Sequence, residues 1–230
     1  MKVEDFLKGQ TLLLDKPLEW SSFQVVNKVR WLIKKQFNIK KIKVGHAGTL
    51  DPLATGLLLI CTGKSTKTIN ELQGQIKEYT GTITLGATTP SYDLETEINA
   101  TFKTDHLTEE IMRATTKQFI GEIEQYPPVF SALKKDGKRL YEYAREGEAV
   151  EIKPRTIEIF EFEIIAINEL NINFRVVCSK GTYIRSLAHD FGKAVDSGAY
   201  LSALRRTKIG NFSVVDAVNI AEFEKSLQLK

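Results

Sequence analysis

The feature that most constrains this chain is a twelve-residue segment, residues 45–56, followed directly by a short apolar run. The segment contains three glycines, a proline and two threonines, a composition that excludes a helix and disfavours a regular strand. The apolar run, residues 57–61, lies between Gly56 and Gly63. It predicts a buried strand, although periodicity alone does not distinguish it from a buried helix. We therefore expect a tightly bent loop mounted on a buried element.

Two side chains of this loop can carry chemistry. Asp51 stands immediately before Pro52, and the proline holds it out of the helical region. His46 lies on the same loop. A rigid loop beside a buried element is a usual mounting for a catalytic residue. On the residues alone, two other interpretations stay open: an Asp-Pro pair is common in turns, where the carboxylate caps a backbone amide, and a single histidine is more often structural.

Length and composition restrict the class of protein. A chain of 230 residues with 42% hydrophobic and 27% charged residues can bury the core of one large domain or two small ones. The two cysteines, Cys61 and Cys178, stand in apolar surroundings and predict reduced thiols without a disulfide framework. The sequence shows no metal-ligand spacing, no signal peptide and no apolar run of membrane-spanning length. We expect a cytoplasmic protein without membrane contact.

Positive charge is concentrated in one stretch. The net charge is only +3, yet residues 20–50 contain no acidic side chain. A local basic excess suits a phosphate backbone, although a charge run by itself is more often a solvated helix face. Because the run leads directly into the Asp51 loop, nucleic acid is the favoured partner. The basic residues of the stretch are Lys28, Arg30, Lys34, Lys35, Lys40, Lys41 and Lys43.

The remaining pattern predicts a mixed α/β chain forming a single domain, residues 1–230, without repeats or linkers. The first helix follows a cap at Ser21 or Ser22 and has apolar residues at helical spacing. Strands are expected at 10–14, 57–61, 78–85, 157–167 and 171–178, with a final pair at 200–206 and 211–215. Helices are expected at about 23–33, 64–72, 108–120, 184–191 and 221–227.

Residues 125–150 differ in character, because they are basic, aromatic and rich in turn residues. An exposed excursion with a short helix at 140–145 is expected there. Aromatic side chains between lysines and arginines suit an unpaired RNA loop, where bases stack and phosphates pair. The alternative is that the aromatics only anchor the loop to the core.

The string at residues 45–56 resembles the catalytic motif of the TruB family of tRNA pseudouridine synthases, which make pseudouridine in the T arm of tRNA. The resemblance extends from Leu12-Leu13-Leu14-Asp15-Lys16-Pro17 to Leu204-Arg205-Arg206, with several separate motifs in order. It implies the α+β pseudouridine synthase fold, which has a mixed, largely antiparallel central sheet flanked by helices. It also implies an RNA-binding thumb inserted at about residues 125–150.

This chain departs from the family pattern in three places. The segment after Pro17 is bulkier than the small or flexible residues usual there, and Phe130 stands where tyrosine is common. Many family members also carry a C-terminal RNA-binding PUA domain, which we do not expect in this chain.

The resemblance implies three catalytic residues. Asp51 matches the family carboxylate, and Arg185 matches a buried cation that keeps it charged, since an enclosed site disfavours the ionised form. A position between Ile184 and Leu187 suits a surface ion pair poorly. Tyr79 matches the active-site tyrosine, which can stack on the uracil and transfer a proton, although an isolated strand tyrosine more often serves packing.

The other implied positions bind substrate. His46 would fill the space left when the target uridine flips out of its loop. Tyr183 and Leu204 match the lining of the uracil pocket, although Leu204 alone would be taken as ordinary core. Lys16 and Lys67 match basic positions that support the loop or a phosphate.

One further acidic residue, Asp93, lies in a turn-rich loop expected at residues 88–95. We expect it to contact RNA or to stabilise its own loop.

The implied reaction breaks the N1–C1′ bond of uridine, rotates the base and rejoins it through C5. Because no redox change or hydrolysis occurs, no cofactor and no metal are expected. The expected partner is tRNA, bound through its T-arm stem-loop at position 55 by a monomer. One alternative is a non-catalytic RNA-binding or tRNA-folding protein, against which the retained Asp51, Tyr79 and Arg185 argue. Another is an N-glycosidase, in which the acid admits water.

Overall fold

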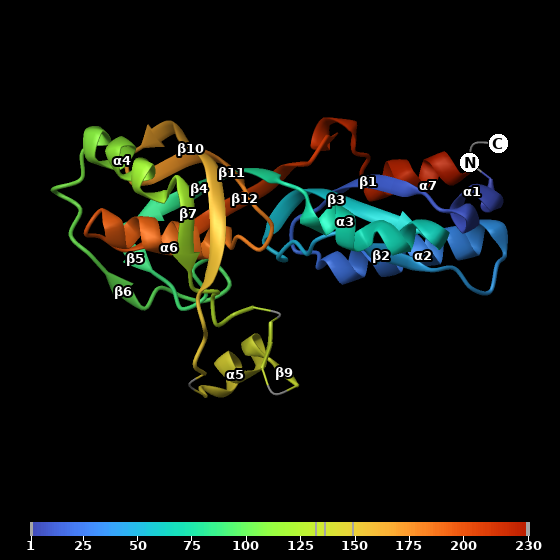
Figure 1. Cartoon of the computed structure of the whole chain (residues 1–230), viewed down its shortest axis with the longest axis horizontal. Coiled ribbons are helices and arrows are strands. Elements are labelled where there is room, and N and C mark those ends of the chain that lie inside the picture. Colours follow the sequence, from blue (N-terminus) through green and yellow to red (C-terminus); the bar gives the residue numbers. More distant parts are fainter. Residues whose placement is uncertain (1, 132, 136, 149, 229–230) are drawn as a thin grey trace. The chain divides into compact units, whose positions relative to one another are not determined.

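The computed structural model of the chain describes residues 2–131, 133–135, 137–148 and 150–228. The chain folds into two compact units, and Figure 1 labels their helices and strands. Unit 1 comprises Met1–Tyr79 and Leu204–Lys230, and unit 2 comprises Thr80–Ala203. Two strands, β4 (Lys77–Leu85) and β12 (Ala199–Ile209), pass from one unit to the other. The single catalytic domain expected from the sequence stays a prediction.

Unit 1 is built around β3 (Ala54–Thr62), in which every residue except Thr55 is buried. This strand pairs antiparallel with β1 (Thr11–Lys16) and β2 (Val44–His46), and parallel with residues 204–206 of β12. The apolar run after the glycine-rich loop is therefore a buried strand, as predicted. The other elements of the unit are α1 (Val3–Lys8), α2 (Ser22–Phe37), the 3-10 helix η1 (Gly63–Thr68), α3 (Ile69–Gly74), β13 (Phe212–Ser213), the 3-10 helix η3 (Val214–Asp216) and α7 (Ile220–Gln228).

Helix α2 covers this sheet in the manner that its sequence predicts. The hydroxyl oxygen of Ser21 accepts a hydrogen bond of 3.2 Å from the backbone N–H of Gln24, which caps the first turn. Asn38 ends the helix in the left-handed conformation, at φ 49°. The apolar stripe of α2 packs on the sheet and on α7 in one core, which includes Val25, Val29, Ile33, Leu58, Ile60 and Phe223.

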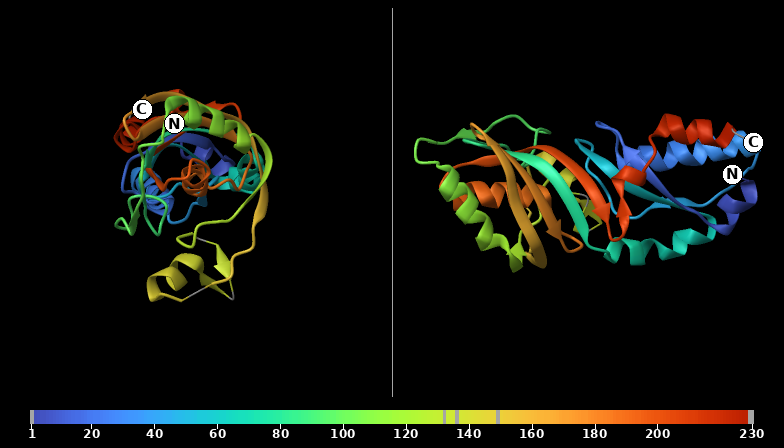
Figure 2. Two further views of the ribbon diagram at one scale, coloured as in Figure 1. Left: turned by 90° about the vertical axis from the view of Figure 1, so that its left-hand side faces the viewer. Right: turned by 90° about the horizontal axis from the view of Figure 1, so that it is seen from above.

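Unit 2 is a sheet with the strand order β12-β4-β11-β10-β7. The hairpin of β10 (Arg155–Asn168) and β11 (Asn171–Cys178) is antiparallel, and β7 (Gly121–Gln125) pairs antiparallel with β10. Helix α6 (Ile184–Ala194) packs on one face, where the ring of Phe191 meets that of Phe162 at 5.8 Å (Figure 2). The remaining elements outside the excursion are β5 (Ala87–Thr88), β6 (Ala100–Thr101), α4 (Glu109–Thr115) and the 3-10 helix η2 (Thr116–Phe119).

The predicted excursion lies between β7 and β10. It consists of the short hairpin β8 (Lys134–Lys135) and β9 (Lys138–Arg139), followed by α5 (Leu140–Glu146). Figure 1 shows this segment projecting from the sheet of unit 2. The short helix expected at 140–145 is thus confirmed. Residues 132, 136 and 149 of the predicted excursion lie outside the described residues.

Three predicted elements differ from the expectation. The helix predicted at 64–72 begins as the 3-10 helix η1 and is α-helical only from Ile69, in α3. The helix predicted at 108–120 keeps its cap at Thr108 but changes to the 3-10 helix η2 at Thr116. The hydroxyls of Thr115 and Thr116 donate to the carbonyls of Ile111 and Arg113, and such back-bonding loosens a helix. The strand predicted at 211–215 ends at Ser213, whose hydroxyl oxygen accepts from the backbone N–H of Val215 at 3.3 Å.

Several short elements were not predicted from the sequence, because each has too few residues to show a period: α1, β2, β5, β6, β7, β8, β9 and η3. Within the described ranges, no helix combines the length and the apolar character needed to cross a membrane.

Candidate active site

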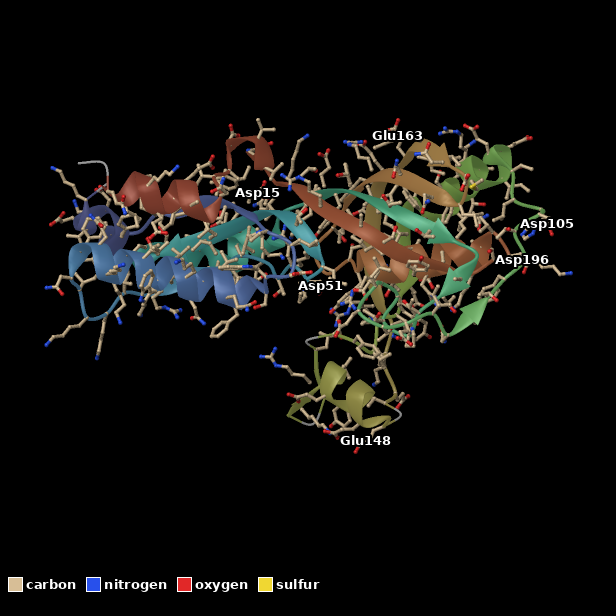
Figure 3. All side chains as sticks on the ribbon, turned by 180° about the vertical axis from the view of Figure 1, so that it is seen from behind. Asp15, Asp51, Asp105, Glu148, Glu163 and Asp196 are labelled. Atoms are coloured by element: carbon tan, nitrogen blue, oxygen red, sulfur yellow. The ribbon has the colours of Figure 1, made fainter. Side chains whose placement is uncertain are left out.

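Asp51 lies in the loop that joins β2 to β3 in unit 1 (Figure 3). Two backbone hydrogen bonds hold the loop to β3. Ala47 N donates to Leu59 O at 2.9 Å, and Ala54 N, at the start of β3, donates to Asp51 O at 3.1 Å. The hydroxyl of Ser22, on α2, both accepts from Leu50 N at 2.8 Å and donates to Leu50 O at 3.1 Å. The backbone on either side of the aspartate is therefore fixed.

A buried arginine, Arg206, supports this loop from β12. Its Nε donates to Leu57 O at 2.8 Å and its Nη2 to Gly48 O at 3.0 Å. Gly56 makes the close approach of the two strands possible, since its φ is 103° and a Cβ atom there would lie 2.3 Å from Arg206 O. At least one glycine of the motif is thus required by strand packing.

Lys16 is a second buried cation on this loop. Its Nζ donates to three carbonyl oxygens, Pro17 O at 2.9 Å, Trp20 O at 2.5 Å and Pro52 O at 3.2 Å. The pKa of Lys16 is lowered to about 8, chiefly because the ammonium group is buried; the charge of Asp51 partly opposes this shift and that of Arg206 adds to it. Lys16 therefore joins the end of β1 to the residue after Asp51.

Two more of the predicted substrate-binding residues flank the Asp51 loop: His46 ends β2 opposite Ile60, and Leu204 lies opposite the first residue of β3. Burial and the charge of Arg206 lower the pKa of His46, so its imidazole is neutral at pH 7. Leu204 pairs with Ala54 at the start of β3, and its carbonyl accepts from Thr55 Oγ1 at 3.5 Å. The structure thus groups Lys16, His46 and Leu204 around the Asp51 loop.

Tyr79 and Lys67 are placed differently. Tyr79 is buried near the start of β4. Its neighbour Glu78 accepts from Thr207 Oγ1 at 2.8 Å, which joins β4 to the end of β12. Lys67 is exposed on η1, which follows the far end of β3. The structure does not bring Lys67 to the Asp51 loop.

In unit 2, Arg185 and Asp93 form a buried ion pair. Arg185 is in the first turn of α6, as predicted, with its Nε 3.5 Å from Asp93 Oδ2. Its Nη1 donates to Ser91 O at 3.2 Å. Asp93 also accepts from Glu95 N at 2.9 Å, so it stabilises its own loop. The predicted pairing of Arg185 with Asp51 joins residues of two units and stays a prediction.

Tyr183 is positioned by a glutamine that the sequence analysis missed. Tyr183 N donates to Gln125 Oε1 at 2.8 Å, and Gln125 Nε2 donates to Tyr183 O at 3.1 Å. Gln125 is buried at the end of β7, and this side-chain amide satisfies the backbone at the start of α6. Arg155 lies over the ring of Tyr183, with its guanidinium carbon 5.9 Å from the ring centroid.

Comparison with known proteins identifies the family. Residues 34–184 match the model of the TruB family pseudouridylate synthase N-terminal domain, and residues 185–230 match that of the tRNA pseudouridylate synthase B C-terminal domain. The chain belongs to the TruB family. A tRNA pseudouridine synthase B of Flavobacterium johnsoniae is 65% identical over 99% of this chain and 100% of its own length. One of Phocaeicola vulgatus is 55% identical over 97% and 95%.

A solved structure, that of a Cbf5-Nop10-Gar1 complex, contains a chain with the same fold. The TM-score is 0.73 at 30% sequence identity, and the match covers 98% of this TruB-family chain and 56% of the other chain. The fold class predicted from the sequence is confirmed by this likeness and by the largely antiparallel sheet of the structure.

Proposed function

We propose that this chain acts on one uridine in the T loop of tRNA, conventionally position 55, and that Asp51 carries the chemistry. The coarser activity follows from the family and its relatives: the chain isomerises uridine in tRNA to pseudouridine. The observation that carries the proposal is the rigid Asp51 loop, with two buried cations supporting it from neighbouring strands.

The reaction is an isomerisation in which atoms balance within the nucleotide. The N1–C1′ bond breaks, the base rotates, and a C5–C1′ bond forms, after which C5 loses its proton and N1 gains one. A carboxylate can serve as a nucleophile or as a base in these steps. Both roles require an ionised Asp51, and the charge of that carboxylate acts on Lys16, whose pKa it raises.

The anchored loop also lowers the cost of positioning the carboxylate. Backbone hydrogen bonds on both sides and the hydroxyl of Ser22 hold the loop before any substrate binds. A group fixed in advance does not lose conformational freedom during the reaction.

We propose that Arg185 and Tyr79 complete the catalytic group. Arg185 is buried and its guanidinium is oriented by Asp93 and by Ser91 O. A guanidinium has five N–H donors in a planar fork, so it can serve two carboxylates. We assign Tyr79 to stacking on the uracil and proton transfer.

Base flipping gives His46 its proposed role. A uridine inside a folded loop must leave its stack to reach Asp51, and a planar ring can occupy the vacated space. The imidazole of His46 is neutral at pH 7, so stacking it on bases does not require the desolvation of a charge. Leu204 and Tyr183 are proposed to line the uracil pocket.

The proposal is tested by incubating the protein with an unmodified T-arm stem-loop and mapping pseudouridine chemically at each position. We expect pseudouridine only at the loop uridine that corresponds to position 55. A control stem-loop in which cytidine replaces this uridine should contain none. Unchanged RNA would favour a non-catalytic RNA-binding protein, and an abasic site would favour an N-glycosidase. Conversion at another tRNA position instead would contradict the T-loop assignment.

A further inference from the structure

A basic groove lies in unit 1, between α2, residues 39–43 and η1. Its volume is about 700 Å³. The two walls are joined by a backbone hydrogen bond from Gly63 N to Lys43 O at 2.9 Å. Among the residues that the structure describes, none that lines the groove is acidic. Its basic lining residues are Arg30 and Lys34 from α2, Lys40, Lys41 and Lys43 from the following segment, and Lys64 and Lys67 from η1.

The charges of this groove face solvent. All six lysines are exposed, and among the described residues none of the six lies in an ion pair. Arg30 is held in place, since its Nη1 donates to Asn27 Oδ1 at 2.7 Å and its Nη2 to Val44 O at 3.0 Å. A concave surface with one sign of charge concentrates the electrostatic field and attracts a polyanion.

A second hollow of about 400 Å³ continues this surface on the other side of Arg30 and Lys34, which line both. Trp31 lines it with 48% of its surface exposed. The Nζ atoms of Lys28 and Lys35 lie 4.6 and 4.8 Å from the centroid of the indole ring. An exposed aromatic ring combined with ammonium groups is typical of surfaces that bind nucleic acid.

The groove lies far from the Asp51 loop along the same strand. Strand β3 has nine residues, begins three residues after Asp51, and ends at the residue before Gly63 in the groove. At about 3.3 Å per residue the strand spans roughly 25 Å. A nucleotide that reacts at Asp51 therefore cannot occupy the groove. An A-form RNA duplex rises about 2.8 Å per base pair and covers that distance in roughly nine base pairs.

We propose that this groove binds the phosphate backbone of a helical stem of the same tRNA, distant from the reacting nucleotide. The inference rests on the proposed function, because it takes the RNA to be a tRNA with its loop uridine at Asp51. The groove contributes affinity, and the Asp51 loop performs the chemistry. Lys67, which the sequence matched to a basic family position, belongs to this binding surface.

The test uses hairpins that share one T loop and differ in stem length, and the variant K41Q/K43Q/K64Q. A matched control, K103Q/K117Q/K225Q, removes three exposed lysines outside the groove. With a stem longer than about nine base pairs, we expect the groove variant to bind about tenfold more weakly. The slope of log affinity against log salt should fall by up to about three, one for each phosphate that the variant no longer neutralises. With a short stem, its affinity should match that of the parent protein.

Each outcome decides the question. Equal affinity of parent and groove variant on every stem length would show that the lysines form only a solvated face, and the proposal would be wrong. An equal loss on short and long stems would place the groove at the loop end and contradict the distal stem contact. The control variant should bind all hairpins with the affinity of the parent. If it loses as much affinity as the groove variant, the loss comes from the lower net charge of the protein and the proposal is wrong. Pseudouridine formation by the parent on the short hairpin tests the proposed function separately.

Discussion

The two ends of β3 use positive charge in different ways. At the Asp51 end, Lys16 and Arg206 are buried and donate to backbone carbonyls of the loop. At the other end, Lys41 and Lys64 are exposed beside a groove without a lining carboxylate. Burying a charge is costly unless the protein supplies partners, so the first pair must act on the structure of the loop. Exposed cations in a concave surface remain available for a phosphate backbone. The number of positive charges does not distinguish loop support from phosphate binding, whereas the burial of each side chain does.

The largest effect is expected from Asp51→Asn, which removes the charge at the first end without altering its shape. Pseudouridine formation should fall at least about a thousandfold, because the carboxylate acts on the reacting nucleotide. The dissociation constant for tRNA should stay within about tenfold of the parent value. Single-turnover kinetics and a binding assay on the same RNA check both. Activity near that of the parent would remove Asp51 from the mechanism.

The next effect compares two neighbouring arginines. Arg206→Met should lower the free energy of unfolding by roughly 3 kcal/mol, because buried carbonyls of Gly48 and Leu57 lose their charged donor. Arg205→Met should cost less than about 1 kcal/mol, since the pair of Arg205 with Asp15 is partly exposed. Urea unfolding of both variants measures the difference. Equal costs would show that burial does not distinguish them.

A smaller effect concerns the pH dependence of stability. The folded chain releases the proton of Lys16 at a pKa of about 8, whereas the ordinary lysine pKa, which applies to the unfolded chain, is 10.5. Between these values the unfolded state binds more protons, so the free energy of unfolding should rise with pH by at most about 3 kcal/mol. Below pH 8 this contribution is flat. Lys16→Met should lack the rise, which is measured as the difference between parent and variant in urea titrations from pH 7 to 10.5. Parallel pH profiles would show that Lys16 is not a buried cation.

The smallest effect is expected at His46. Because burial lowers the pKa of His46, the imidazole should not titrate between pH 7 and 8. His46→Gln should weaken tRNA binding by about tenfold or less, because the stacking ring is absent, and by the same factor at both pH values. Binding titrations at pH 7 and 8 check this. A penalty that appears only at pH 7 would indicate a charged histidine in contact with RNA.

The parts of this site that depend on residues close together in the chain could be predicted from the sequence. Glycine, proline and an apolar run determine the backbone conformation and burial of their own segment. The Asp51 loop and the strand after it were recognised in this way, and helix α2 was recognised from its cap and stripe. Arg206 was missed because it meets Gly48 across 158 positions of sequence. Gln125 was missed for the same reason, since it binds the backbone of Tyr183 across 58 positions. No local signal marks either residue, because Arg205, Thr207 and Lys208 surround Arg206, and Glu122 and Glu124 precede Gln125.

Lys67 shows what a family resemblance leaves undetermined. A match to a family motif marks a residue as functional without saying where the fold places it. Its place in the lining of the basic groove came from the structure alone. The resemblance assigned Lys16 and Lys67 one shared role, whereas one is buried and the other is exposed beside a groove.

The most direct test of this division compares two variants on one long-stem hairpin that contains the T loop. For Asp51→Asn, the account predicts a rate at saturating RNA reduced at least about a thousandfold with a nearly unchanged dissociation constant. For K41Q/K43Q/K64Q, it predicts an unchanged rate at saturation and a dissociation constant raised about tenfold. If both variants lost rate and affinity together, chemistry and stem binding would not be divided between the two ends of β3.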